Sequence, residues 1–478
     1  MRLKGLFAVN NSSERTGETS ALLAILLLAF VLRAGLAVFY PGIAHPDEIF
    51  QYQEPVHKLL TGLGVPSWEW NRHIRSWFIP GLVLPIMAAV RLFTHSPTVY
   101  WDAISCVLSA ASLPVVWVAF RWGREQGGRE GGIIAGFLAA VSFQLVYFSS
   151  HLLMDTVAAD LLVPALYACR EYRLKGGLRA LAWGSALLGV LLYVRPQIGP
   201  ILLVPAIATL LEAKRRGEAL ACLGWGLGPL LALGALDWIT LGQPFRSVWM
   251  YAYINLFQVE DEFGVAPFYW YLKNSATVWM LAIVPIGYFS WKASRYFRLE
   301  WITALLIVVL MSAVSHKEPR FILPAQAVLL VLTGVGIGTF RLGRSGFWAR
   351  PSSIGGIIAI TSLGLALAHP FLPVIQRSHA DVMVITRVMK DPQACGIYFS
   401  PRQSLLAYAG YTGTRDGVRL FSDRFDTPAA NAKHANYIVT RLLPRQSVPI
   451  PARFALKFCK ESTSNYQVCV YHRPGGCG

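Results

Sequence analysis

The chain has 478 residues, of which 54% are hydrophobic and only 14% charged, whereas soluble domains carry roughly 25% charged residues. This composition excludes an ordinary soluble domain and indicates a multi-span membrane protein. The formal net charge of +17 fits that class, since Arg and Lys collect in cytoplasmic loops, and no basic stripe with interleaved aromatics suggests a nucleic-acid partner.

The first long apolar segment, Ala21–Tyr40, is followed by a polar loop with two adjacent acids. The segment is longer than the roughly 7–15-residue core of a signal peptide, so we expect a retained membrane helix. Asp47 and Glu48 come soon after it, and charge beside hydrocarbon is costly and usually functional. Pro46 before them is typical of a first helical position. Solvated acids in a first helical turn are also common, so this pattern alone leaves both interpretations open.

The rest of this loop mixes aromatic side chains with hydrogen-bonding groups. Trp68, Glu69 and Trp70 are followed closely by Arg75. Trp faces pack against sugar rings, and Trp is also frequent at membrane interfaces. The apolar segment Trp77–Phe93 contains two prolines and an arginine, so we expect a juxtamembrane or re-entrant helix there rather than a span.

Twelve apolar segments occur in all, and we expect eleven of them to cross the membrane, Trp77–Phe93 being the exception. With this count, the N-terminus and every second loop from Arg121 onward are basic and cytoplasmic, as the positive-inside rule requires. The loop with Asp47, the turn near Asp155 and Arg195 then share the extracytoplasmic face. The eleven predicted spans are Ala21–Tyr40, Val99–Phe120, Gly132–Phe148, Leu152–Ala168, Ala180–Val194, Ile198–Leu211, Ala219–Trp238, Ser275–Tyr288, Trp301–Val314, Phe321–Phe340 and Ile354–Ala368.

A second polar cluster interrupts the apolar sequence on the same predicted face. It holds three potential cations, His316, Lys317 and Arg320, where short outer loops are usually poor in Lys and Arg. Arg and Lys are the usual partners of phosphate, so the cluster predicts a phosphate site. Pairing with Glu318 or with lipid headgroups is the alternative. Arg195, at the end of a predicted span, is a second candidate for the phosphate.

The chain becomes polar after the last apolar segment, and we expect a small soluble α/β domain at residues 371–478, outside the membrane. Alternation and β-propensity predict strands at Cys395–Phe399, Tyr437–Val439 and Tyr466–Tyr471. Clustered cysteines predict disulfides in such a compartment. Zinc is the competing interpretation, but no C-x-x-C spacing supports it. The four cysteines, whose pairing stays open, are Cys395, Cys459, Cys469 and Cys477.

One predicted face therefore carries a carboxylate base and a group of cations. Sugar transfer from a lipid phosphate needs both, because the acceptor hydroxyl requires a base and the leaving phosphate requires positive charge. A direct displacement uses one carboxylate and inverts the anomeric centre, by analogy with inverting glycosidases. Since no nucleotide diphosphate takes part, we expect no metal and no other cofactor.

These motifs resemble the GT-C glycosyltransferases, specifically the group that contains the GPI mannosyltransferases and the ALG9- and ALG12-type mannosyltransferases. HPDE followed by WEW and, much later, HKEPRF is a specific combination. The aromatic stretch Ala266–Tyr271 departs from the family's usual motif, which leaves the acceptor and the sugar open. The matching stretches are His45-Pro46-Asp47-Glu48, Gln53-x-x-x-His57, Trp68-Glu69-Trp70, Ile74-Arg75-Ser76, Phe263–Leu272 and His316-Lys317-Glu318-x-Arg320-Phe321.

The resemblance implies an all-α polytopic catalytic domain at residues 1–370, with a long first extracytoplasmic loop at 41–98 that contains juxtamembrane helices. It implies a polyprenyl- or dolichyl-phosphate sugar, typically mannose, as donor, and we expect a lipid-linked glycan as acceptor. Asp47 is the implied base, with Glu48 as the alternative. The expected donor-phosphate residues are His316, Lys317, Arg320 and Arg195. The expected acceptor or sugar residues are His45, Gln53, Glu54, Trp68, Glu69, Trp70, Arg75 and Tyr269.

The cysteine-rich C-terminus is similar to bacterial members, which favours a bacterial inner membrane with a periplasmic site; an ER membrane with a lumenal site is the alternative. A transporter or flippase of lipid-linked saccharides is the competing function. Transporters place charges at the bilayer midplane in paired halves, a pattern that the sequence does not show. A ligase with a large glycan acceptor would share the donor site.

Overall fold

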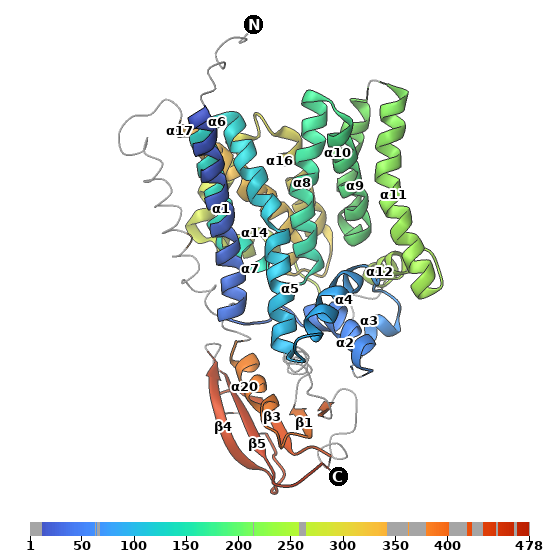
Figure 1. Cartoon of the computed structure of the whole chain (residues 1–478), viewed down its shortest axis with the longest axis vertical. Helices are drawn as coiled ribbons and strands as arrows, with labels where there is room; N and C mark the ends of the chain where they lie inside the picture. Colours follow the sequence, from blue (N-terminus) through green and yellow to red (C-terminus); the bar gives the residue numbers. More distant parts are fainter. Residues whose placement is uncertain are drawn as a thin grey trace.

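The computed structural model describes residues 12–341, apart from 63, 65–66, 214 and 258–263, and then residues 362, 379–400, 418–422, 434–445, 448–462 and 466–477. A tall bundle of helices stands above a small C-terminal sheet, and the short helices of the first loop lie at the junction between them (Figure 1). The described residues are thus mostly helical, with a small sheet near the C-terminus.

The chain enters the bundle through α1 (Ser12–Phe39) and then forms the first loop. That loop folds into the π-helix η1 (Glu48–Gln53), α2 (Glu54–Thr61), α3 (Trp68–Asn71) and α4 (Phe78–Arg91). The left-handed φ of 74° at Gly62 ends α2, as is usual for a helix C-terminus. With 14 residues, α4 is too short to cross a hydrocarbon core of about 30 Å, as predicted for this segment.

The rest of the bundle consists of helices of unequal length. The pair α9 and α10 is bent by 116° around the short helix η2, which begins with a proline. The elements are α5 (Pro97–Ala111), α6 (Leu113–Val141), α7 (Phe143–Phe148), α8 (Met154–Lys175), α9 (Leu178–Val194), η2 (Pro196–Ile198), α10 (Gly199–Leu211), α11 (Arg216–Leu241), α12 (Arg246–Phe257), α14 (Trp270–Trp279), η3 (Met280–Ala282), α15 (Ile283–Ala293), α16 (Arg298–Ala313), η4 (Pro319–Ile322) and α17 (Leu323–Arg341).

The segment α6 turns back on itself at Gly128, whose φ of 65° and ψ of −161° are not helical. A Cβ built on Gly123 would lie 2.3 Å from the carbonyl oxygen of Gly131. In a continuous helix, residues eight positions apart are separated by about 12 Å. The two halves of α6 are therefore antiparallel neighbours, and the predicted basic loop between two apolar segments is this turn.

The described residues contain four segments that are long and apolar enough to cross a membrane, or five if the bent pair of α9 and α10 counts as one span. The four are Thr16–Phe39, Thr98–Val141, Arg216–Leu241 and Pro319–Phe340. The predicted total of eleven spans is thus not confirmed. The last predicted span, Ile354–Ala368, lies almost entirely outside the described residues, of which only residue 362 falls within it.

Basic residues from several helices gather at one end of the bundle. Arg170, near the C-terminus of α8, donates hydrogen bonds of 2.7 and 2.9 Å to Glu125 at the turn of α6. Arg173 donates a hydrogen bond of 2.7 Å to Glu300 at the start of α16. The N-terminus of α8 carries Asp155 at the opposite end of this 22-residue helix, about 30 Å away by helix rise. The basic turns and the candidate site therefore lie at opposite ends of the bundle.

The C-terminal part contains α20 (His379–Met389) and a five-stranded sheet of order β2-β1-β3-β5-β4. Strand β1 pairs in parallel with β2 and β3, whereas β5 pairs antiparallel with β3 and β4. The structure joins Cys395 to Cys477 and Cys459 to Cys469. Three strands occur where they were predicted; β2 and β4 were not predicted. The strands are β1 (Gly396–Ser400), β2 (Arg419–Ser422), β3 (Tyr437–Leu442), β4 (Ala455–Ser462) and β5 (Tyr466–His472).

The C-terminal part packs directly on the first loop. Ile43, Ile49 and Trp101 share one apolar core with residues of α20 and the sheet. The ring of His379 stacks on Tyr40 with 4.1 Å between centroids. Because Ile49 follows the two acids of the first loop by one or two positions, this packing supports the backbone that carries them.

Candidate active site

The first loop presents Asp47 at the start of a helix. The helix begins beside Pro46, as predicted, and continues as the π-helix η1. π-Helical turns are rare, and those that occur are often at functional sites; no local pattern predicted this one. The side chain of Asp47 remains 23% exposed, so it is accessible to a substrate.

Two basic groups contact the Asp47 carboxylate. Nη2 of Arg320 donates a hydrogen bond of 2.7 Å to Oδ2, and Nδ1 of His45 lies 3.0 Å from Oδ1. Burial alone would raise the pKa of Asp47, but Arg320, together with His45 and Arg75, holds that pKa well below its ordinary value. Asp47 is therefore ionised at neutral pH, as a general base must be. The contact between Arg320 and Asp47 joins residues that are 273 positions apart in the sequence.

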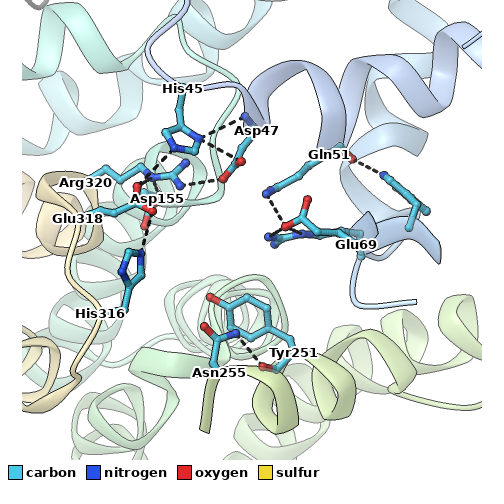
Figure 2. A network of polar contacts seen from close by, with 12 residues as sticks. His45, Asp47, Gln51, Glu69, Asp155, Tyr251, Asn255, His316, Glu318 and Arg320 are labelled. Atoms are coloured by element: carbon cyan, nitrogen blue, oxygen red, sulfur yellow. Dashed lines mark hydrogen bonds and ion pairs between the residues drawn. The ribbon is translucent and has the colours of Figure 1, made fainter. Parts of the chain in front are cut away.

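Arg320 is the centre of this group of charges. Its Nε donates a hydrogen bond of 2.7 Å to Glu318 and lies 3.7 Å from Oδ2 of Asp155. Glu318 also contacts His316, at 3.2 Å. Burial would raise the pKa of Glu318, but the His316 and Arg320 contacts lower it to about 2. Figure 2 shows His45, Asp47, Arg320, Glu318 and Asp155 clustered on one side of the site.

A second group of polar residues lies across from this cluster (Figure 2). Glu69 accepts hydrogen bonds from Arg75 at 2.5 and 3.2 Å and from Gln51 at 2.9 Å. The Arg75 guanidinium lies 5.5 Å from the centre of the Tyr251 ring. Burial raises the pKa of Glu69, and Arg75 opposes this effect. The pairing keeps an arginine fixed beside the site.

Arg195 joins the two groups. It forms an ion pair with Asp155, and its Nη1 lies 3.4 Å from the Tyr251 hydroxyl. A small cavity lies beside Arg195 and Tyr251. The polar residues lining the cavity are Arg75, Ser76, Tyr193, Arg195, Ser247 and Tyr251. Two arginines and four hydroxyl groups thus converge on one small space.

Glu48, the predicted alternative base, is fully buried and engaged on both oxygens. Oε1 accepts hydrogen bonds from the backbone of Ala44 at 2.7 Å and of His45 at 3.1 Å. Oε2 accepts one from the backbone of Leu152 at 3.2 Å and lies 2.9 Å from Nδ1 of His151. This carboxylate ties the first loop to the turn before α8 and is shielded from solvent.

Lys317 also lies apart from the charged cluster, although it was expected beside the donor phosphate. Its ammonium group donates hydrogen bonds to the backbone carbonyls of Ala266, at 2.8 Å, and of Val314. Ala266 also donates a backbone hydrogen bond of 2.9 Å to Ser315. Burial lowers the pKa of Lys317. The lysine therefore fastens the loop before α14 to the turn before η4.

Several predicted acceptor residues lie outside the network, whereas His45, Glu69 and Arg75 belong to it. Gln53 and Glu54 are buried, and Glu54 lies 3.7 Å from His57. Trp68 is partly exposed with Arg72 over its ring. Trp70 touches the edge of the network, since it donates a hydrogen bond of 3.2 Å to the backbone of Gln51. Tyr269, just before α14, is 62% exposed.

Three members of the network had no role assigned from the sequence. Asp155 was predicted only to share a face with Asp47, Glu318 was considered only as a partner of neighbouring cations, and Tyr251 was not singled out. An acid in the first turn of an apolar helix is the one signal that pointed to Asp155. Nothing in the sequence connects Tyr251 with two arginines from other elements.

The fold and the one-sided site define the class of protein. The apo crystal structure of ArnT from Cupriavidus metallidurans is similar to this chain with a TM-score of 0.60 and 14% identity, over 96% of this chain and 98% of that chain. ArnT bound to undecaprenyl phosphate gives a TM-score of 0.59 and 11% identity, with the same coverage. The chain has the GT-C glycosyltransferase fold. It belongs to the Alg9-like mannosyltransferase family, whose model matches residues 24–398.

Curated relatives agree with this membership. GPI mannosyltransferase 3 of Drosophila melanogaster is 28% identical over 324 residues, which cover 65% of this chain and 55% of that protein. The alpha-1,2-mannosyltransferase ALG9 of Saccharomyces cerevisiae is 25% identical over 341 residues, covering 66% and 58%. The chain thus spans a little over half the length of these relatives.

Proposed function

We propose that this chain is an inverting glycosyltransferase. It moves a sugar, mannose according to its family, from a polyprenyl-phosphate donor to a hydroxyl of a lipid-linked or glycan acceptor. The observation that carries the proposal is the 2.7 Å contact between Asp47 and Arg320, because it brings an ionised carboxylate and a buried cation to one site. Supporting it are the family membership and the relation in fold to a protein crystallised with undecaprenyl phosphate.

Asp47 acts as the general base in this proposal. It is the acid of the pair that retains exposed surface, and it is ionised because of Arg320. It accepts the proton of the acceptor hydroxyl while that oxygen attacks the anomeric carbon. Glu48 has the role of holding this loop in place through its four contacts.

Arginines neutralise the leaving phosphate. Arg320 and Arg195 flank Asp155, and Arg75 lies on the other side of Tyr251. Arginine matches the geometry of phosphate oxygens, so this set can stabilise the charge that develops on the leaving group without a metal. Lys317 has no direct part in donor binding and positions the loop of Ala266.

The active site faces the extracytoplasmic side of the membrane. The basic residues at the turn of α6 and the end of α8 mark the cytoplasmic end, and the candidate site lies at the opposite end. The two disulfides of the C-terminal part fit an oxidising compartment. A bacterial inner membrane with a periplasmic site is the proposed location, and an ER membrane with a lumenal site is the alternative.

The test is a transfer assay with the purified protein in lipid nanodiscs. Undecaprenyl- and dolichyl-phosphate mannose are offered together with other polyprenyl-phosphate sugars, and the products are identified by mass and anomeric configuration. We expect transfer with inversion by the wild type and loss of transfer in Asp47→Asn. Retention of configuration, or transfer only from a nucleotide sugar, would refute the proposal.

A further inference from the structure

Among the described residues, the arginines that act on Asp47 are already paired with acids. Arg320, whose side chain is 11% exposed, contacts Asp47 and Glu318 at 2.7 Å and Asp155 at 3.7 Å. Arg195 is bound to Asp155. The cluster is thus neutralised from within, as buried charges require.

The donor phosphate therefore has to replace a carboxylate before it can reach an arginine. Arg320 is not among the residues that line the cavity beside Arg195 and Tyr251, and its own side chain is largely covered by its acids. Among the three acids on Arg320, Asp47 and Glu318 have side chains that are 23% exposed, whereas Asp155 is 3% exposed. Asp47 is held by Nη2 at the end of the guanidinium, so this contact can be exchanged while Nε stays on Glu318.

We propose that the donor phosphate takes the place of Asp47 on Arg320, so that the base is released for catalysis only when the donor is bound. This inference rests on the proposed function and adds the regulation of the base to it. Asp47 is a poor base while it is paired with Arg320, because a contact that lowers a carboxylate's pKa also lowers its affinity for protons. Loss of that contact, with a phosphate nearby, raises its basicity.

The transfer step is balanced with these groups alone. The acceptor oxygen forms a bond to the anomeric carbon and gives its proton to Asp47. The bond between the anomeric carbon and the phosphate oxygen breaks, and its electron pair stays on the phosphate. That phosphate gains one negative charge, which Arg320 stabilises. The glycoside and the polyprenyl phosphate then leave, and the proton returns to solvent.

The other polar and charged groups around Asp47 influence how readily the phosphate replaces it on Arg320. Nδ1 of His45 lies 3.0 Å from the carboxylate and keeps a polar partner beside Asp47 after Arg320 moves. Arg75 acts at longer range and is paired with Glu69. Glu318 and Asp155 remain on Arg320 and limit how strongly it holds the phosphate, which favours product release.

The exchange predicts that a catalytically dead variant binds the product lipid more tightly. The probe is undecaprenyl phosphate, or dolichyl phosphate if the wild type prefers it, titrated into protein in nanodiscs of neutral lipid. Asp47→Asn removes the competitor for Arg320, and we expect about tenfold tighter binding. Asp47→Glu keeps the competing charge and is expected to change the affinity less than threefold.

A double-mutant cycle separates this exchange from a general effect of charge. In an Arg320→Gln background, and in Arg320→Lys as a second background, the Asp47→Asn substitution is expected to change the affinity less than twofold. Asp391→Asn, which removes an equal charge from an ion pair with Lys457 in the C-terminal part, is the matched control and should have no effect. Equal tightening in both backgrounds, or none in the wild-type background, would overturn the exchange while transfer itself remains. If the wild type binds no polyprenyl phosphate and transfers nothing, the proposed function fails as well.

Discussion

Substitution of Glu48 by glutamine tests the assignment of the two neighbouring acids. Glu48 is fully buried and accepts three backbone hydrogen bonds in addition to its contact with His151. A glutamine places an NH₂ group where one carboxylate oxygen stood. In either orientation of the amide, at least one backbone N–H then faces another donor.

The cost follows from these contacts. Loss of a hydrogen bond to a charged group costs about 1.5–3 kcal/mol, and a buried donor left without a partner costs about 1–3 kcal/mol more. We therefore expect Glu48→Gln to lower the free energy of unfolding by about 3 kcal/mol or more. Transfer should fall in kcat, because the backbone that carries Asp47 loses its anchor, but it should not be abolished.

The assay is reversible unfolding in mixed micelles, combined with steady-state transfer. Glu171→Gln is the matched control, since it removes the same charge from an exposed i,i+4 pair with Lys175 that is worth about 0.5 kcal/mol. If Glu48→Gln unfolds with the same free energy as the wild type, Glu48 does not anchor the first loop. Complete loss of transfer with unchanged stability would instead make Glu48 the base.

Four further outcomes are expected. Asp47→Asn should reduce kcat by about 10²–10⁴-fold with unchanged unfolding; near-normal turnover would exclude it as the base. The acid limb of the kcat profile should lie at higher pH than the acid limb of kcat/KM for the donor. In the donor-free protein Arg320 holds the pKa of Asp47 well below the usual value of about 3.9, and donor binding removes this effect, so that Asp47 is protonated, and inactive, at a higher pH. Acid limbs at the same pH would contradict this. Lys317→Met should lower the free energy of unfolding by about 1.5–3 kcal/mol and leave the donor KM within threefold of the wild-type value. A large rise in the donor KM would indicate that Lys317 binds the donor phosphate after all. His379→Ala removes the stack on Tyr40 and should lower the free energy of unfolding by about 0.5–1.5 kcal/mol, with a larger effect on kcat than on KM. Met383→Ala, on the exposed side of the same helix, should change neither stability nor kcat.

The parts of the fold that depend on local sequence were predictable. Alternating β-branched and aromatic residues indicated three of the five strands. Two prolines and a short length identified α4 as a helix that does not span. Strand β4 was not predicted because all of its residues are exposed or half-buried and present no apolar alternation. The π-helix η1 was not predicted because its form depends on packing against α4 and the C-terminal part.

The site was predictable as a set of residues on one face but not as a set of roles. Lys317 and Arg320 look equivalent in sequence, yet one binds backbone carbonyls 3 and 51 positions away and the other binds Asp47 at a separation of 273. Asp47 and Glu48 are neighbours, but successive helical side chains point in directions about 100° apart. One therefore faces the arginine and the other the turn at His151. Such pairings are decided by tertiary contacts that a local pattern does not contain.

The pairing of each buried arginine with an acid explains why the sequence alone did not show which acid is the base and which acids only neutralise arginines. A site that binds a lipid phosphate beside a membrane needs buried arginines, and unpaired buried arginines are strongly destabilising. The protein must therefore supply carboxylates to each of them before the substrate arrives, as Asp155 does for Arg195 and Glu69 for Arg75. Such a site contains more acids than catalysis uses. In the proposed mechanism the base is Asp47, which is partly exposed and is held by the terminal Nη2 of Arg320, whereas Glu318, equally exposed, is held by Nε and by His316.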